Sequence, residues 1–191
     1  MKKLVLTILL VFATVNIFAQ FTTYYNFSST TQTYTEISGG TVQVSGSNID
    51  NNIINITTPP LCFKASITTL YKQINISANG FITFGTTAPT PTNYAPIAST
   101  ESYDGAISGV GMDLESIDNS SEIRTGQIGD EFVVQWKNFK RKGAIGDTIN
   151  FQIRMDTLGS NIKIVYGTIV AGTGSVVFPQ VGMRGSNSAN D

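Results

Sequence analysis

The sequence predicts an all-β protein, an antiparallel β-sandwich of the jelly-roll or lectin-like kind. Residues 20–191 contain 20 Ile and 10 Val but only 4 Leu, beside abundant Thr, Ser and Asn. β-branched side chains fit pleated strands and lose rotamer freedom in helices. No window carries an apolar stripe at helical spacing, whereas several short runs alternate between apolar and polar residues. Together these observations favour strands throughout.

The first 19 residues predict a signal peptide for secretion. A basic start, Met1–Lys3, precedes an apolar run over Leu4–Val15, and the small residue Ala19 stands before the expected cleavage point. The run is too short to span a bilayer, which takes about 20 apolar residues. We therefore expect residues 20–191 to be exported as one β-sandwich domain, either secreted or held at the outer cell surface, without a membrane span.

Composition excludes several classes of function. Without Lys2 and Lys3, 10 of the 12 Lys+Arg remain against 13 Asp+Glu, a net charge of −3, and the basic residues are scattered. Nucleic acid is therefore not an expected partner, since phosphate binding needs a concentrated positive surface. The chain has no His and one Cys, which excludes Ser-His-Asp and Cys-His catalysis, His-bound metals and internal disulfides.

Apolar alternation defines the first of three hairpins, over Tyr71–Phe84. A three-residue loop at Ala78–Gly80 gives Gly80 the left-handed conformation that such loops require. This loop length keeps the apolar residues of both strands on one face, whereas a two-residue turn would divide them between faces. The expected cross-strand pairs are Ile74 with Phe84 and Ile76 with Ile82.

The second hairpin turns at Gly129–Asp130 and the third within Thr157–Ser160. Alternate residues form an apolar inner row and a polar outer row, so we expect each sheet to have one covered and one solvated face. The expected pairs are Ile123 with Trp136, Thr125 with Val134, Gln127 with Phe132, Met155 with Ile162, Ile153 with Ile164, and Phe151 with Tyr166. The residues assigned to the solvated side are Glu131, Gln135, Lys137, Arg154 and Lys163.

Other strands are expected at Tyr24–Phe27, Thr41–Ser45, Ile53–Ile56, Ala106–Leu114 and Val177–Arg184. Between Gly85 and Gly105 lies a long stretch with three prolines and few core candidates. Unstructured loops longer than about 12–15 residues are uncommon and often functional.

Several segments together resemble a module common at the N-terminus of large exported proteins of Bacteroidetes bacteria, which often carry fibronectin-like repeats and use type IX secretion. The resemblance spans roughly residues 21–185. It implies a non-enzymatic surface or secreted module of a lectin-like kind, and an origin as part of a longer protein. The segments that carry it are Tyr25–Ser28, Tyr34, Gly39–Thr41, Ile76–Gly85, Asp113–Leu114, Val134–Phe139, Ile149–Ile153 and Ile164–Gly167.

Asp113, Glu115 and Asp118 are candidate Ca²⁺ ligands, because Ca²⁺ accepts six to eight oxygens from carboxylates and carbonyls. Their spacing lacks the glycine of the EF-hand loop, and the alternative is that they are solvated acids at strand ends. A glycosidase pair among the same acids is a further alternative, although the sequence does not define the carboxylate separation that such chemistry needs.

Tyr94 and Tyr103, in the proline-bearing stretch, are candidate platforms for a sugar ring, since tyrosine offers a flat apolar face with a polar tip. Alternatively, both pack the loop onto the sheet. Trp136 is expected in the core.

Asp147–Ile149 and Asp156–Leu158 are similar to the short O-glycosylation signal of Bacteroidetes, which makes Thr148 and Thr157 candidate modification sites.

The leading hypothesis is a non-catalytic module for binding or adhesion outside the cell, with an extracellular glycan or a surface protein as its partner. No cofactor is expected apart from the Ca²⁺ considered above. The alternatives are a structural spacer domain in a larger secreted protein and, less favoured, a carbohydrate-active enzyme.

Overall fold

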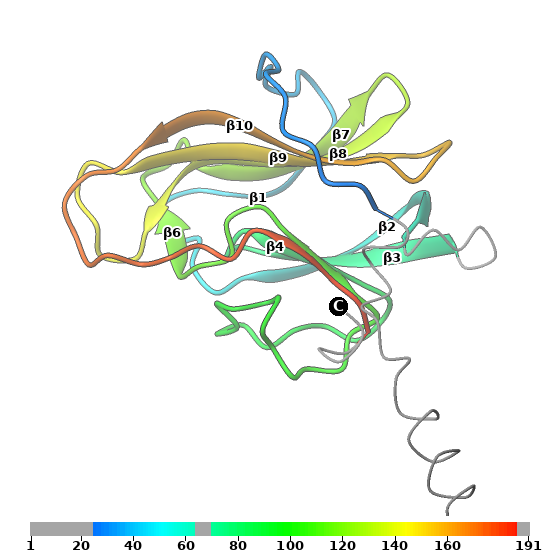
Figure 1. The fold of residues 1–191 in the computed structure, drawn as a ribbon. Coiled ribbons are helices and arrows are strands. Elements are labelled where there is room, and N and C mark those ends of the chain that lie inside the picture. Colours follow the sequence, from blue (N-terminus) through cyan, green and yellow to red (C-terminus); the bar gives the residue numbers. More distant parts are fainter. Residues whose placement is uncertain (1–24, 64–69, 187–191) are drawn as a thin grey trace, which may run out of the picture.

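The computed structural model describes residues 25–63 and 70–186. Within these residues, two antiparallel sheets pack face to face, so the predicted β-sandwich is confirmed (Figure 1). The expected signal peptide, its cleavage point and Tyr24 lie outside the described residues.

Each sheet is built mainly from strands that follow one another in the chain. The smaller sheet has the order β11-β5-β4-β3-β2. The larger sheet has the order β1-β7-β8-β9-β10, and β6 pairs with the far half of β8. The strands are β1 (Thr41–Ser45), β2 (Ile53–Cys62), β3 (Leu70–Ser77), β4 (Phe81–Phe84), β5 (Ala106–Ser108), β6 (Leu114–Ser116), β7 (Glu122–Ile128), β8 (Glu131–Arg141), β9 (Thr148–Asp156), β10 (Ile162–Val170) and β11 (Gly182–Arg184).

The registers expected for all three hairpins are confirmed. In the first, Ile74 pairs with Phe84. The next inward pair, Ile76 with Ile82, is also as expected. Gly80 at the tip has a φ of 84°, the left-handed conformation that the three-residue loop requires. The second and third hairpins match their expected pairs residue for residue.

The other expected strands fit less closely. Thr41–Ser45 is confirmed as β1, and the strand expected at Ile53–Ile56 continues to Cys62. The strand expected over Ala106–Leu114 is instead two short strands, because the main chain at Gly109–Val110 turns to bond the Gly80 carbonyl. Only the last three residues of the strand expected at Val177–Arg184 form β11, and residues 25–27 form no strand.

Trp136 joins the two layers at the centre of the core, as its expected inward orientation requires. Its side chain is fully buried and its ring stacks on Phe151 at a centroid distance of 4.7 Å. Its Nε1 donates a hydrogen bond of 3.0 Å to the carbonyl of Ser77, which belongs to the opposite sheet. The only indole of the chain therefore contributes both apolar contact and a polar link between layers.

A bulge in β8 turns two aromatic residues to the same face although they are three positions apart. Strict alternation would turn Phe139 outward when Trp136 faces inward. The register between β8 and β9 shifts between these residues, and Asn138 adopts a φ of 58°. The Asn138 N–H donates to Asn150 Oδ1 at 2.6 Å, which supports this conformation. Phe139 is fully buried as a result.

The outer face of the larger sheet is covered, so the expectation of a solvated face is wrong there. The N-terminal segment, residues 25–40, crosses this sheet (blue in Figure 1). Beneath it, Gln135 and Arg154 are 0% and 4% exposed, contrary to their assignment to solvent. Gln135 Oε1 accepts a hydrogen bond from Ile37 N–H, because the main chain of the segment replaces water as its partner. Glu131 and Lys137 are partly exposed and Lys163 is exposed, in agreement with their assignment to solvent.

The outer face of the smaller sheet is covered in the same way, by the loop 85–105. Asn75 is fully buried, and its Nδ2 donates to the carbonyls of Gly85 and Thr87 at 3.2 Å each. Arg184 of β11, also fully buried, donates to two further carbonyls of the loop. The long proline-bearing stretch is therefore held down over most of its length.

Replacing Trp136 by Phe removes the inter-sheet hydrogen bond and leaves a small cavity. We expect the free energy of unfolding, measured by urea denaturation, to fall by about 2–4 kcal/mol. Leu158→Ala is the control, because Leu158 is 81% exposed and its truncation should change stability by less than about 0.5 kcal/mol. Equal stability of Trp136→Phe and wild type would contradict the role given to this residue.

Candidate functional site

Two groups of candidate residues that lie far apart in the sequence meet at one end of the sandwich. Burial raises the pKa of the Tyr94 hydroxyl, the neighbouring carboxylates of Asp113 and Asp50 raise it further, and Asn51 and Lys142 act in the opposite direction. Tyr94, from the long loop, therefore lies among side chains from three other segments. We call these five residues the Tyr94 cluster.

Asn79, at the tip of the first hairpin, connects the segments that form this cluster. It is fully buried, and its Oδ1 accepts a hydrogen bond of 3.0 Å from Leu114 N–H. Its Nδ2 donates to the carbonyl of Pro91 at 3.0 Å and to Asn51 Oδ1 at 3.4 Å. The sequence marks Asn79 only as a turn residue, since nothing in its neighbourhood signals contacts with three distant segments.

Opposite charges meet in the cluster. Lys142 Nζ forms ion pairs with Asp50 and, at 3.2 Å, with Glu115. Glu115 lies 3.3 Å from Lys140 Nζ and accepts a hydrogen bond from Gly143 N–H at 3.0 Å. Burial alone would raise the pKa of Glu115, but these donors together hold that pKa below its usual value. Glu115 is therefore a fixed anion that positions the lysines.

Asp113 is the least compensated acid of the group. Burial raises its pKa, the nearby Asp50 carboxylate raises it further, and Lys142 opposes both effects. Asp113 Oδ1 and Asp50 Oδ1 are buried atoms without a hydrogen-bond partner among the described residues. The cluster therefore contains two enclosed acceptor oxygens whose desolvation is not offset by a donor from the described residues.

The three candidate Ca²⁺ ligands do not form a common site. Asp118 is exposed and accepts hydrogen bonds from the N–H and hydroxyl of Ser120 in its own turn, which lower its pKa. Glu115 is engaged by lysines, as described above. Within residues 25–63 and 70–186, no three Asp, Glu, His or Cys side chains come together to hold a metal ion. The structure therefore does not bring these three side chains together, and Ca²⁺ binding by this set stays a prediction.

Tyr103 is buried and does not offer its ring as a second platform. It is 1% exposed, and its hydroxyl donates to the Pro96 carbonyl at 2.5 Å. The Arg184 guanidinium carbon lies 4.3 Å from its ring centroid. Tyr103 thus holds the loop on the sheet, which is the alternative considered from the sequence, while Tyr94 is only partly buried.

An apolar cleft of about 300 Å³ opens beside the same end, between the end of β10 and the segment that follows it. At its polar edge, Arg141 Nε donates to Asp147 Oδ2 at 2.6 Å, and the Tyr166 hydroxyl donates to the Gly109 carbonyl at 2.6 Å. These polar groups are already paired with protein, so the cleft offers chiefly dispersion contacts. Its apolar lining comes from Val110, Met112, Ile149, Ile169, Val170, Val177, Pro179 and Val181.

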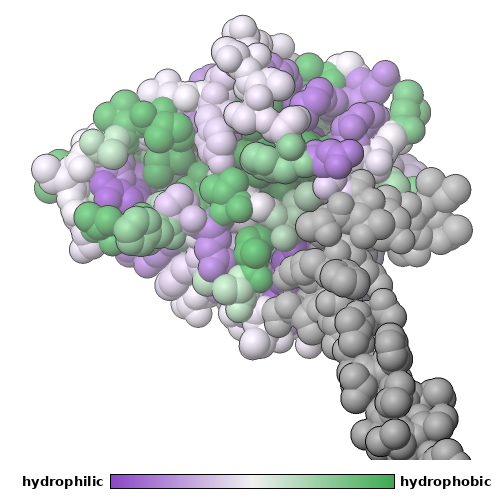
Figure 2. All heavy atoms as spheres, in the orientation of Figure 1, coloured by the Kyte–Doolittle hydropathy of each residue, from purple (hydrophilic) through white to green (hydrophobic). Residues whose placement is uncertain are grey.

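Exposed hydrophobic side chains surround this cleft. Val176 and Phe178 are 81% and 85% exposed, and Ile145, on the β8–β9 turn, is 76% exposed. Figure 2 shows hydrophobic surface concentrated at this end of the molecule. Such concentrations are uncommon on isolated soluble domains and mark sites of contact.

The candidate modification sites lie at opposite ends of β9. Thr148 begins β9 and is partly buried, next to the buried Asp147. Thr157 is partly exposed, and its hydroxyl donates to the Asp130 carbonyl at 2.8 Å. Their O-glycosylation stays a prediction.

The protein is therefore a two-sheet β-sandwich with the Tyr94 cluster and the apolar cleft side by side at one end. The chain belongs to the NIDO-related family, whose family model matches residues 24–191. Membership indicates an extracellular module, in agreement with the setting expected from the sequence. Comparison with curated proteins and with solved structures found no match. Across residues 25–63 and 70–186, no helix has the length and apolar character to cross a membrane.

Asp147 supplies a pH-dependent contribution to this end of the molecule. Hydrogen bonds from Arg141 are the main reason that its pKa lies at about 2, below the usual value near 4. Because the folded pKa is the lower one, the stabilisation is complete above about pH 4 and is lost as the pH falls through about 2. We expect Asp147→Asn to lower the free energy of unfolding at neutral pH by about 1–3 kcal/mol.

The difference between Asp147→Asn and wild type should shrink between about pH 4 and pH 2 in urea denaturation, since wild type loses the same interaction there. Asp130→Asn, at an exposed hairpin turn, is the control and should stay close to wild type. A difference that is constant down to pH 2 would contradict the assignment.

Proposed function

We propose that this chain is a non-catalytic binding module of an extracellular protein, and that it binds carbohydrate at the Tyr94 cluster. Membership of the NIDO-related family supports the extracellular setting. The expected signal peptide and the resemblance to modules of exported Bacteroidetes proteins support secretion to the cell surface. The observation that carries the choice of ligand is the partly exposed Tyr94 ring among amide, carboxylate and ammonium groups.

The chemistry of the cluster fits a polyhydroxylated ligand. An aromatic ring stacks on the apolar face of a sugar, while amides and carboxylates bond its hydroxyl groups. Asp113 and Asp50 are partly exposed, and the accessible part of each carboxylate is an acceptor for a sugar hydroxyl. Lys142, held by Asp50 and Glu115, supplies the complementary donor.

A binding role explains these acids better than catalysis does. A glycosidase needs one carboxylate as an acid and a second one free to act as nucleophile or base. Glu115, the candidate partner of Asp113, accepts hydrogen bonds or ion pairs from Lys140, Lys142 and Gly143, and its lowered pKa opposes proton donation.

We expect residues 20–191 to bind a subset of glycans on an array, and Tyr94→Ala to weaken that binding by about tenfold, a loss of about 1.4 kcal/mol. Tyr94→Phe keeps the ring and should lose less. Phe27→Ala is the matched control, because Phe27 is 96% exposed and lies on the N-terminal segment. A blank array for wild type would exclude carbohydrate, and unchanged binding by Tyr94→Ala would exclude this site.

The apolar cleft favours a second candidate, in which the module packs against another domain of a larger protein. Val176, Phe178 and Ile145 are exposed around a cleft whose edge polar groups are already paired. Such a surface gains free energy from apolar side chains of a partner and little from sugars. This candidate corresponds to the spacer role among the alternatives from the sequence.

If this surface takes apolar groups, anilinonaphthalene sulfonate should bind it and fluoresce, and Phe178→Ser should reduce that fluorescence because it removes an exposed apolar side chain beside the cleft. Leu158→Ser is the matched control, since Leu158 is equally prominent at 81% exposure but lies on the third hairpin turn. Equal fluorescence from the two variants would count against a docking role for this end.

A further inference from the structure

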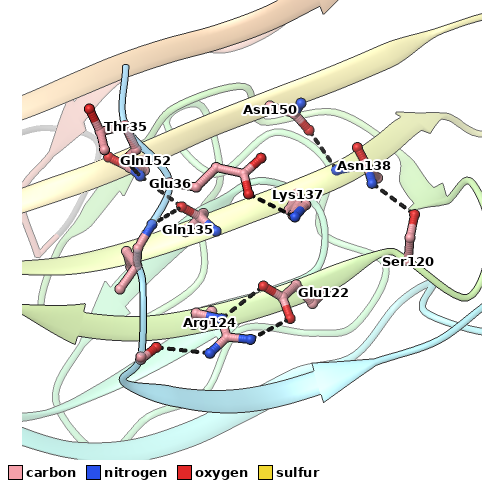
Figure 3. Close-up of polar contacts among 12 residues, drawn as sticks. Thr35, Glu36, Ser120, Glu122, Arg124, Gln135, Lys137, Asn138, Asn150 and Gln152 are labelled. Carbon is pink, nitrogen blue, oxygen red and sulfur yellow. Dashed lines mark hydrogen bonds and ion pairs between the residues drawn. The ribbon is translucent and has the colours of Figure 1, made fainter. Parts of the chain in front are cut away.

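The N-terminal segment lies on the outer face of the larger sheet like a bound peptide (Figure 3). Ile37 N–H donates to Gln135 Oε1 at 2.9 Å, and the Thr35 carbonyl accepts a hydrogen bond of 2.8 Å from Gln152 Nε2. Both glutamines are fully buried side chains of neighbouring strands. The contact is therefore made by side chains of the sheet to the main chain of the segment, without a shared strand ladder.

Charged side chains hold both flanks of this contact. Glu36 pairs with Lys137 at 2.7 Å, and Arg124 Nη1 donates to the Gly39 carbonyl at 2.8 Å. Arg124 is itself held by Glu122. These partners are visible around the segment in Figure 3.

Two glycines of the sheet make room for the segment. A Cβ at Gly126 would lie 2.7 Å from Ile37 Cγ2, and a Cβ at Gly167 would lie 2.8 Å from the Tyr34 ring. Both distances are shorter than real Cβ contacts, so a larger residue at either position would force the Ile37 or Tyr34 side chain to shift. The outer face of the sheet thus has two notches: the one at Gly167 receives the aromatic Tyr34, and the one at Gly126 receives the β-branched Ile37, three positions later.

The segment is held loosely despite this fit. Residues 26–33 and 35–36 are exposed, and Ile37 is the only buried residue between 25 and 40. Gln135 Nε2 and Tyr34 Oη are buried atoms without a hydrogen-bond partner among the described residues. The contact can therefore open at a smaller free-energy cost than the core beneath it.

A two-glycine hinge joins the segment to β1. Gly39 and Gly40 have φ values of 89° and 70°, so the chain makes a tight turn that other residues rarely adopt. A Cβ at Gly40 would lie 2.2 Å from the Thr125 carbonyl oxygen. Straightening this hinge would carry the segment away from its own sheet without disturbing β1.

We propose that residues 25–40 exchange between two copies of this chain, each segment filling the notched face of the other molecule. The contacts of residues 34–37 described above are all between the segment and the sheet, so they form equally well across two copies. The Gly39 contact with Arg124 belongs to the hinge. Only the hinge differs between the closed monomer and the exchanged dimer. Exchange of an identical element in this way is a low-cost route to a dimer.

Gly40→Val tests this proposal because it penalises only the closed hinge. Valine at φ 70° is strongly strained, and its Cβ would clash with the Thr125 carbonyl, whereas an extended hinge avoids both problems. At equal concentration, we expect the dimer fraction measured by size-exclusion chromatography with light scattering to rise about tenfold over wild type. Gly129→Val, at a φ of 58° with no atom within 4 Å, is the matched control and should not dimerise.

A complementation experiment identifies the exchanged surface. In the Gly40→Val background, Ile37→Asp disables the segment and Gly126→Val fills the notch. Each double variant alone should be monomeric, whereas their mixture should give a heterodimer by native mass spectrometry, because one intact segment then meets one intact face. Circular dichroism should report the same strand content for all variants.

Three results would overturn the proposal. The first is a folded Gly40→Val chain that stays monomeric at every concentration. The second is a dimer that both double variants form alone, which would indicate another surface. If Gly40→Val does not fold, the third is the absence of a heterodimer when Ile37→Asp and Gly126→Val are mixed in the otherwise natural chain.

Discussion

The structure depends on buried amide side chains that bind the main chain of irregular segments. Gln135 and Gln152 hold residues 25–40 on the larger sheet, and Asn75 and Asn79 hold the long loop on the smaller one. Each amide replaces lost hydration of both partners, so these segments without regular structure are held against the sheets through their main chain. The same kind of contact forms the Tyr94 cluster, since Asn79 brings Tyr94, Asn51 and Asp113 within reach of one another.

The inner half of the fold could be predicted because it follows from local periodicity. Ile74 with Phe84, Ile123 with Trp136 and Ile153 with Ile164 are pairs set by alternation and turn length alone. The outer half could not be predicted in the same way. A polar residue at an outward position predicts contact with solvent. Nothing in the sequence near Gln135 or Arg154 indicates that a segment about a hundred positions earlier in the chain covers them.

The sequence indicated individual residues of the candidate site but not that they lie together. Tyr94 and Asp113 are recognisable by residue type, but their meeting depends on Asn79 and Lys142. In the sequence, Asn79 indicates only a turn and Lys142 only a charge in solvent. The apolar cleft gave no signal either, because Val176 and Phe178 lie in a short apolar run that is indistinguishable from a buried strand. Tertiary contacts between distant segments decide both features.

The position of the Tyr94 cluster along the strands has a mechanical consequence. Tyr25 lies 6.5 Å from Phe63, ring to ring, and Phe63 borders the chain at Gly105 and Arg184, so Tyr25 and Arg184 both lie at the Cys62 end of the β2–β3 pair. The Tyr94 cluster lies at the opposite end, beside Asn79. A pull between a ligand bound at the Tyr94 cluster and the Cys62 end would run along the strands, loading their hydrogen bonds in shear and in parallel instead of one after another.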